Sequence, residues 1–142
     1  MTKRKEVFLY SILVVYFLLL LYFAVISRNP TSRRVVWMDL LGGYIHPRYN
    51  SVSNGLLNIC SFVPIGVLVG LIAEKYRIGK AMLAGFLVSV VIEFSQLIWR
   101  RGVFDVDDFL NDLIGAFVGC VLVVLVTSFR NKASKKASLI QN

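Results

Sequence analysis

The residues best suited to chemistry lie in one short segment between long apolar runs. Residues 100–112, RRGVFDVDDFLND, hold two arginines and four aspartates. Carboxylates serve as acids, bases and hydrogen-bond acceptors, and a guanidinium group binds a carboxylate or phosphate through two parallel hydrogen bonds. The apolar run before this segment contains one further carboxylate, Glu93. Residues 93–112 are therefore the first candidate for a functional site.

Four long apolar runs must position these residues. The chain is 57% hydrophobic and 17% charged, with a mean hydropathy of +0.71, which is far more apolar than a soluble domain. The run from Val7 to Ile26 has no charge and can cross a bilayer; it is too long for a signal peptide and lacks a cleavage motif. The sequence predicts an all-α, polytopic membrane protein of one domain, 1–142, with transmembrane helices near 7–27, 55–73, 79–98 and 110–129.

Polar and small residues recur along one face of three of these helices. Spacings of three or four residues place side chains on one helix face. Small residues on such a stripe let helix backbones approach closely, as in GVLVG (66–70) and GAFVG (115–119). The first helix has no stripe, so we expect helices two to four to form the core bundle with the first outside it. The stripes are Asn58, Phe62, Gly66 and Gly70; Gly85, Ser89, Glu93 and Gln96; and Asp108, Asn111, Gly115 and Gly119.

The distribution of basic residues predicts the orientation. Ten of the 16 lysines and arginines, including every lysine, fall in the N-terminal segment, the connection between the second and third helices, and the C-terminal tail. The positive-inside rule therefore predicts a cell-membrane protein with both termini in the cytoplasm. The net charge of +8 is then a fringe that faces anionic lipid headgroups, and we expect no nucleic-acid partner.

The sequence does not indicate metal or cofactor chemistry. The single histidine, His46, has no cysteine or carboxylate at ligand spacing. Cys60 and Cys120 fall within predicted membrane helices without metal-type spacing, so we interpret them as small packing residues. We expect no metal and no cofactor.

The polar ends of the three stripes predict a pocket at the outer membrane face. Glu93 lies about five residues, or roughly 7–8 Å of helix rise, from the outer end of its helix. A carboxylate at this depth must face the bundle and find a partner, and Arg101 is the expected counter-charge. The expected lining is Asn58, Glu93, Gln96, Arg101, Asp105, Asp108 and Asn111, with Glu93 and Asp108 as the candidates for any catalysis.

A purely structural interpretation of the same residues remains open. A Glu–Arg pair and asparagine hydrogen bonds can lock three helices together. Asp107 or Asp108 can serve as an N-cap of the fourth helix, with Asp112 in its first turn. Against this interpretation, every acid outside the lysine-rich segments except Asp39 lies within residues 93–112. Ionisable residues within a membrane are functional candidates by default.

Three segments resemble the signature blocks of the VanZ-like family of small bacterial membrane proteins: NICSFVPIGVLVG (58–70), SVVIEFSQ (89–96) and RRGVFDVDDFLNDLIGAFVG (100–119). The resemblance covers about residues 55–128. It implies a role in resistance to glycopeptide or lipoglycopeptide antibiotics such as teicoplanin, or in envelope homeostasis. The matching positions are Asn58, Phe62, Pro64, Gly66, Glu93, Gln96, Arg101, Asp105, Asp108, Asn111, Gly115 and Gly119. Of these, Phe62, Pro64, Gly66, Gly115 and Gly119, with Gly70, are expected to be structural.

The first outer connection, residues 28–54, carries no part of this signature. Within RRVVWMDLLGGYIHPRY (33–49), helical spacing and interfacial aromatic residues allow a short amphipathic helix that roofs the pocket. A loop with a few anchoring aromatic residues fits equally well. The residues at helical spacing are Val36, Trp37, Leu40, Leu41 and Tyr44.

Three functions are compatible with these features. In the first, the pocket binds a lipid headgroup or a lipid-linked wall precursor and so limits where a lipoglycopeptide can anchor. In the second, the protein is an enzyme on an amphiphilic substrate, with Glu93 or an aspartate as acid or base and Arg101 on a phosphate. The third, a transporter, is disfavoured because the predicted pocket is one-sided and four short helices leave little room for alternating repeats. The sequence does not predict an oligomeric state.

Overall fold

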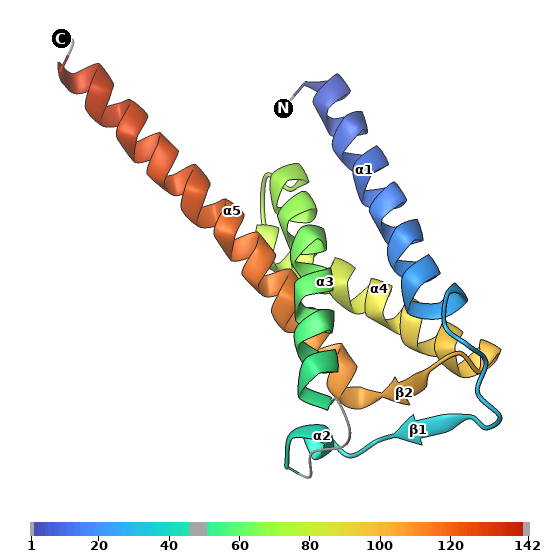
Figure 1. Ribbon diagram of the computed structural model, residues 1–142. Coiled ribbons are helices and arrows are strands. Elements are labelled where there is room, and N and C mark those ends of the chain that lie inside the picture. The colour runs from blue at the N-terminus through green and yellow to red at the C-terminus, as the bar shows by residue number, and fades with distance from the viewer. Residues whose placement is uncertain (1, 46–50, 141–142) are drawn as a thin grey trace.

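The computed structural model describes residues 2–45 and 51–140, and within them a mainly helical chain with one pair of short strands (Figure 1). Helix α1 continues directly into a π-helical turn, η1. The elements in chain order are α1 (Lys3–Leu21), η1 (Tyr22–Ile26), β1 (Val35–Trp37), α2 (Gly42–Ile45), α3 (Ser51–Ile72), α4 (Arg77–Trp99), β2 (Val103–Asp105) and α5 (Val106–Ile140).

Four helical segments of the described chain are long and apolar enough to cross a membrane, which confirms the predicted multi-pass membrane protein. The ends of the predicted helices are less accurate. Helix α5 begins at Val106 instead of near 110, and it continues to Ile140 instead of ending near 129. The apolar run ends at Phe129, but the tail beyond it is rich in lysine, alanine and serine and has no glycine or proline to stop the helix. At 1.5 Å per residue the 35-residue helix is about 52 Å long, well beyond a hydrocarbon core of about 30 Å.

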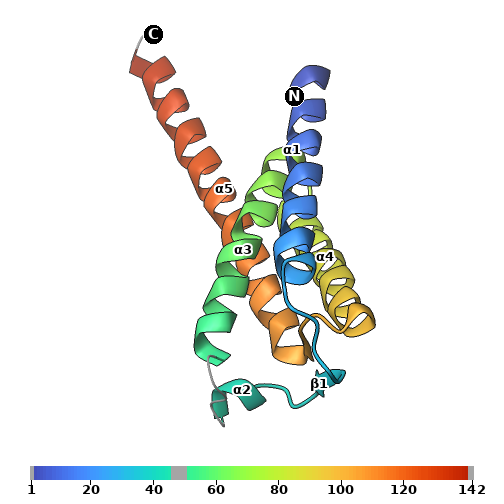
Figure 2. The same cartoon turned by 45° about the vertical axis from the view of Figure 1, so that its right-hand side comes forward.

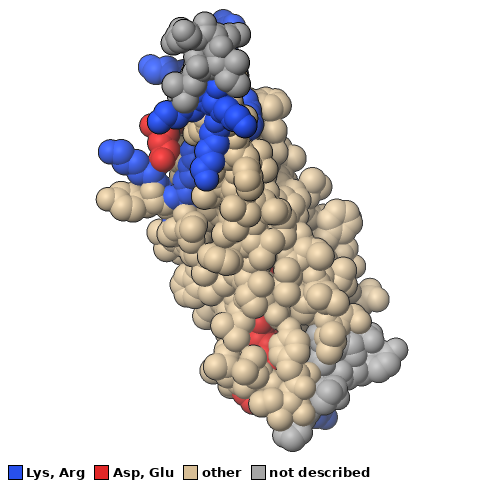
Figure 3. Space-filling model, turned by 90° about the vertical axis from the view of Figure 1, so that its left-hand side faces the viewer, with Lys and Arg blue, Asp and Glu red and all other residues tan. Residues whose placement is uncertain are grey.

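Both ends of the chain lie at one end of the molecule, and α2, β1 and β2 lie at the other (Figures 1 and 2). We call these the terminal end and the loop end. Lysine and arginine side chains gather at the terminal end, and a broad surface without charged side chains separates them from a few acidic atoms near the loop end (Figure 3). This charge-free band is the part of the surface that fits a lipid environment.

Helices α3, α4 and α5 form the close-packed part of the bundle, as predicted. The tightest contact is between α3 and α5. A Cβ atom on Gly66 would overlap the backbone carbonyl of Ala116, and one on Gly119 would overlap the carbonyl of Val63. Gly115 meets the carbonyl of Ile59 in the same way. The small residues therefore bring two backbones into direct contact.

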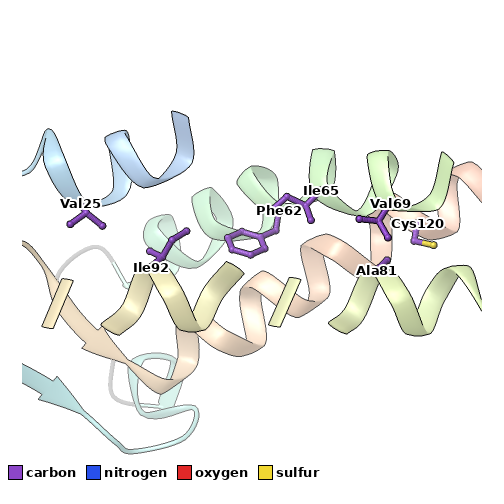
Figure 4. Close-up of a cluster of buried hydrophobic side chains, with 7 residues drawn as sticks. All are labelled: Val25, Phe62, Ile65, Val69, Ala81, Ile92 and Cys120. Carbon is purple, nitrogen blue, oxygen red and sulfur yellow. The ribbon is translucent and has the colours of Figure 1, made fainter. Parts of the chain in front are cut away.

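The apolar core continues along this contact, and the first membrane segment adds the buried Val25 of η1 to it and packs partly buried side chains of α1, such as Leu13 and Leu20, against it. Helix α1 itself has no buried residue, so it packs on the outside of the bundle, as predicted. Its link to α3 includes a hydrogen bond from the Tyr16 hydroxyl to the carbonyl of Ser61, 2.8 Å long. The core side chains in Figure 4 are Val25, Phe62, Ile65, Val69, Ala81, Ile92 and Cys120.

The two cysteines lie inside α3 and α5, but only one is a packing residue. Cys120 is fully buried against the α3–α5 contact, whereas Cys60 is exposed on the outer surface of α3. The interpretation of Cys60 as a core packing residue is therefore wrong. Cys60 lies two positions from Phe62 and Asn58, and so on the opposite side of a helix with 3.6 residues per turn.

The first connection is a strand and one helical turn. Of the two alternatives, the amphipathic helix over Val36–Tyr44 is therefore wrong. Residues 35–37 pair in parallel with β2, in the register Val35–Val103, Val36–Phe104 and Trp37–Asp105. The β-branched residues of this segment favour the extended conformation. The ring of Phe104 in β2 packs edge-on against Phe94 of α4, with ring centres 5.6 Å apart, and this fixes the strand pair to the bundle.

Candidate functional site

Two adjoining cavities lie near the loop end of the bundle. The first, the loop-end chamber, has a volume of about 120 Å³ and lies under β1 and α2. The second, the buried chamber, has a volume of about 210 Å³ and lies deeper, between α1–η1, α3, α4 and α5. Arg28, Leu57 and Asn58 line both chambers, so the two are neighbours at these three residues.

The loop-end chamber is mostly polar and is roofed by the first connection. Asp108 and Asn111 line it from α5, and Asn58 lies close enough to hydrogen-bond with Asp108. The Tyr44 hydroxyl of α2 donates a hydrogen bond of 2.7 Å to Asn111 Oδ1 across the chamber. Trp37 of β1 completes this side of the lining. The first connection therefore does roof the pocket, as a strand and one helical turn instead of a continuous amphipathic helix.

The buried chamber contains the most deeply placed polar side chains. Glu93 is 2% exposed and Gln96 is 3% exposed, and both line this chamber from α4. Glu93 Oε2 accepts a hydrogen bond of 3.0 Å from the backbone N–H of Asp105, at the end of β2. Gly102, with φ of +147°, lies directly against the Gln96 side chain, where a Cβ would overlap the amide group. The turn between α4 and α5 is thus folded onto the two α4 side chains.

Asp112 is a site residue that sequence reasoning placed only in the first turn of a helix. It lines the buried chamber and is 3% exposed. Its Oδ2 accepts a hydrogen bond of 2.5 Å from the Ser89 hydroxyl, but its Oδ1 is buried and has no hydrogen-bond partner within the described part of the chain. Because α5 is packed between α3 and α4, its buried face is two residues wide and includes both Asn111 and Asp112. The four-residue spacing from Asp108 was the signal that could have identified Asp112.

The cation at the junction of the two chambers is Arg28, which the prediction did not include. Arg28 follows η1 and lines both cavities, and it is close enough to Asp108 for their charges to interact. It lies outside the signature blocks, so the motif spacing could not identify it. A single arginine directly after the first apolar run was the available signal.

Arg101 lines neither chamber, and its guanidinium group does not make the predicted pair with Glu93. Its Nη1 instead donates hydrogen bonds to the backbone carbonyls of Ile26, at 2.5 Å, and of Arg28, at 3.2 Å. These carbonyls lie at the C-terminal end of the first membrane helix, where the last carbonyl groups have no partner within the helix. Arg101 therefore positions the segment that carries Arg28.

The aspartates that begin α5 have separate tasks. Asp105, the residue before the helix, accepts a hydrogen bond of 3.0 Å from the Asp107 N–H and is the N-cap. The expectation that Asp107 or Asp108 would be the cap is therefore wrong. The Asp107 carboxylate accepts hydrogen bonds from the backbone N–H groups of Leu41, at 2.5 Å, and Gly43, at 3.1 Å. Asp107 thus holds the first connection above the chamber.

The structure places six of the seven predicted lining residues in the two chambers. Asn58, Asp105, Asp108 and Asn111 line the loop-end chamber, and Asn58, Glu93 and Gln96 line the buried one. Among the described residues, no group of three or more His, Cys, Asp or Glu side chains is placed to hold a metal ion. His46 and Arg48 lie outside the described residues.

A third cavity, of about 510 Å³, lies at the terminal end and shares no lining residue with the two chambers. It lies between α1, α3 and α4, with charged residues that include Glu6, Lys75 and Lys80 at its rim. The terminal half of the bundle is therefore not closed on this side. This third cavity is separate from the pocket that was predicted at the outer face.

The fold and the site define a class: a small multi-pass helical membrane protein with an acidic, partly enclosed pocket at its loop end. The sequence matches the VanZ/LLP1 family over residues 7–127, and the chain belongs to that family. The match includes the first helix and the first connection, which lie outside residues 55–128, the part of the chain that the motifs cover. Membership in this family supports the interpretation of the chain as a VanZ-like membrane protein linked to resistance. Neither the curated proteins nor the solved structures contain a match to this chain.

Replacing Arg101 by alanine should loosen the segment that carries Arg28. The change removes the donor to the carbonyls of Ile26 and Arg28, and hydrogen bonds to charged groups contribute about 1.5–3 kcal/mol. We expect hydrogen exchange of the amides of residues 27–34 to accelerate by about tenfold or more, which is the change that such an energy produces. Arg100→Ala is the matched control, because the Arg100 side chain is exposed. Equal exchange rates in both variants would contradict the assignment.

Proposed function

We propose that this protein binds the polar headgroup of an amphiphilic envelope molecule, a membrane lipid or a lipid-linked wall precursor, in its two chambers. The observation that supports this most directly is the junction of polar and apolar surface in the buried chamber. Glu93, Gln96 and Asp112 line one side, and Leu20 and Phe23 of the first membrane helix line another. A site that offers both kinds of surface within a membrane span suits a molecule with a polar head and an apolar chain.

The proposed orientation places the loop end outside the cell. This follows from the basic side chains at the terminal end and the positive-inside rule. The chambers then open toward the leaflet in which wall precursors are presented. A protein that holds or withdraws such lipids limits the anchoring of lipoglycopeptides such as teicoplanin, and this would connect the pocket with the resistance role of the family.

The proposal is tested by measuring lipid binding when the junction of the chambers is filled. Asn58→Leu adds an apolar side chain where both chambers meet, and Ser53→Leu makes a comparable change at an exposed position of the same helix that lines neither. Trp37 lines the loop-end chamber, so a Trp99→Phe background leaves it as the only tryptophan, whose fluorescence can be excited selectively. We expect Asn58→Leu to weaken lipid binding by about tenfold or more, or about 1.4 kcal/mol. Ser53→Leu should bind as the parent protein does. Unchanged binding in Asn58→Leu contradicts the proposal.

A second candidate function is an enzyme that modifies such a molecule. The favouring observation is that Glu93 and Asp112, two carboxyl groups suited to proton transfer, line the same chamber as Arg28. In this scheme Arg28, and not Arg101, holds the phosphate, while Asp108 lies in the neighbouring chamber. Mass spectrometry of envelope lipids from cells with and without the protein separates the two functions. A new lipid species supports the enzyme, and an unchanged lipid profile eliminates it.

A further inference from the structure

The buried chamber indicates which class of headgroup it takes. We propose that it binds an aminophosphate headgroup, with the ammonium group on the buried carboxyl groups of Glu93 and Asp112 and the phosphate at Arg28. This inference rests on the proposed function and narrows it to one chemistry.

One carboxyl oxygen of the chamber lacks a hydrogen-bond donor. Asp112 Oδ1 is buried without a partner in the described chain, although a buried polar atom without a hydrogen bond is destabilising. Glu93 lies close enough to Asp108 and Asp112 that a negative charge on one of these carboxyl groups disfavours a charge on the others. Among the described residues, no lysine or arginine other than Arg28 lines this chamber. The missing element is a group that supplies both N–H donors and a positive charge.

A primary ammonium group meets both requirements. It carries three N–H donors and one positive charge in a compact volume. A hydroxyl group supplies one donor and no charge, so it leaves the buried carboxylates uncompensated. A trimethylammonium group supplies the charge but no N–H donor, so Asp112 Oδ1 keeps no hydrogen bond. The acids therefore favour an amine over the other common headgroup termini.

The other end of the headgroup lies next to Arg28. This residue borders the buried chamber and the loop-end chamber, and Arg101 holds its backbone in place. A guanidinium group binds a phosphate through paired, charge-assisted hydrogen bonds. The chamber thus has a phosphate donor at its junction and acceptors for an amine at its base, which is the order of charges along an aminophosphate headgroup.

The apolar residues that line the buried chamber indicate the path of the lipid's acyl chains. Leu20, Phe23 and Ala24 of α1 and η1 line the same chamber, and Phe23 is also exposed on the outer surface of the bundle. Lipid chains can therefore leave along the side of the first helix. The volume of about 210 Å³ is far above the roughly 10–15 Å³ that a single water molecule requires.

The test compares lipids that share their acyl chains and differ only in the headgroup. The full-length Trp99→Phe protein in detergent is titrated with short-chain phosphatidylethanolamine, phosphatidylcholine and phosphatidylglycerol, with Trp37 fluorescence as the readout. We expect phosphatidylethanolamine to bind about tenfold or more tightly than the other two. Asp112→Asn, which removes the charge and keeps an oxygen for Ser89, should reduce this preference to about twofold. Ser89→Ala removes the hydrogen bond between Ser89 and Asp112 but keeps the carboxyl group of Asp112, so this variant should retain the preference for phosphatidylethanolamine.

The possible outcomes separate the two proposals. Equal binding of the three lipids overturns the aminophosphate class and leaves headgroup binding intact. A preference that survives in Asp112→Asn also overturns it, because the buried carboxylate then plays no part. If none of the lipids binds, the proposed function itself fails. Should Asp112→Asn not fold, as judged by its melting curve, the headgroup series on the parent protein decides alone.

Discussion

Gly119→Ala is expected to destabilise the bundle severely. The added Cβ would overlap the backbone carbonyl of Val63, and a backbone atom inside a packed helix pair cannot move aside as a side chain does. Overpacking in a core costs about 1–3 kcal/mol where side chains can adjust, so about 3 kcal/mol or more is expected here. The loss should appear as a lower melting temperature of the purified protein in detergent.

The control for this prediction is a second glycine in a helix. Gly79, in the first turn of α4, has open space where a Cβ would lie. Alanine has a higher helix propensity than glycine by about 1 kcal/mol, so Gly79→Ala should leave the melting temperature unchanged or raise it. If Gly119→Ala melts like Gly79→Ala, the direct α3–α5 backbone contact is not present in the protein.

Glu93→Ala is expected to weaken headgroup binding strongly. The change eliminates a buried carboxylate of the chamber and leaves the backbone N–H of Asp105 without its acceptor. It also removes the proposed hydrogen bond between the headgroup and Glu93. A charge-assisted hydrogen bond contributes about 1.5–3 kcal/mol, which corresponds to a loss of affinity of roughly tenfold to a hundredfold. The measurement is the same Trp37 fluorescence titration, followed by the antibiotic susceptibility of cells that carry the variant.

Two further substitutions distinguish a binding role of Glu93 from a structural one. Glu93→Gln keeps an acceptor for the Asp105 N–H but removes the charge, so it should fold normally and still lose binding. Glu93→Met removes all polar interactions at nearly the same volume. If Glu93→Met keeps both binding and the resistance phenotype, Glu93 only locks the helices together, and the binding role is disproved.

The bundle itself could be predicted from the sequence, because hydropathy and small-residue spacing act within single helices. Runs of apolar residues located the four spans, and small-residue stripes indicated the three helices of the core; the GVLVG and GAFVG segments lie on α3 and α5, the two in closest contact. The length of α5 could not be predicted in the same way. Its tail leaves the apolar region but has no residue that stops a helix, so hydropathy ends before the helix does.

The site could be predicted only in part, because its lining depends on contacts between distant segments. Motif spacing identified the residues on the faces of α3, α4 and α5. Trp37 reaches the loop-end chamber through a pair of three-residue strands formed from segments about 70 residues apart, and the segment of Arg28 is held by the distant Arg101. No local sequence pattern reveals either contact. Charge complementarity predicts a pair between Arg101 and Glu93, and this prediction is wrong. The Arg101 side chain instead donates hydrogen bonds to backbone carbonyls at the end of the first helix, which have no partner within that helix.

The way in which the first connection is attached has a consequence for how such proteins can diversify. The α4–α5 turn and the start of α5 hold this connection mainly by its main chain: Arg101 binds the carbonyls of Ile26 and Arg28 where it begins, Asp107 binds two of its N–H groups, and β2 pairs with its strand. Apart from Thr31 and Tyr44, which hydrogen-bond to the Arg100 carbonyl and to Asn111, most described side chains of the connection take no part in these attachments. They can be exchanged without detaching the roof from the chamber. The scaffold is therefore suited to accept new specificity by point substitution in the roof, while the bundle beneath it stays the same.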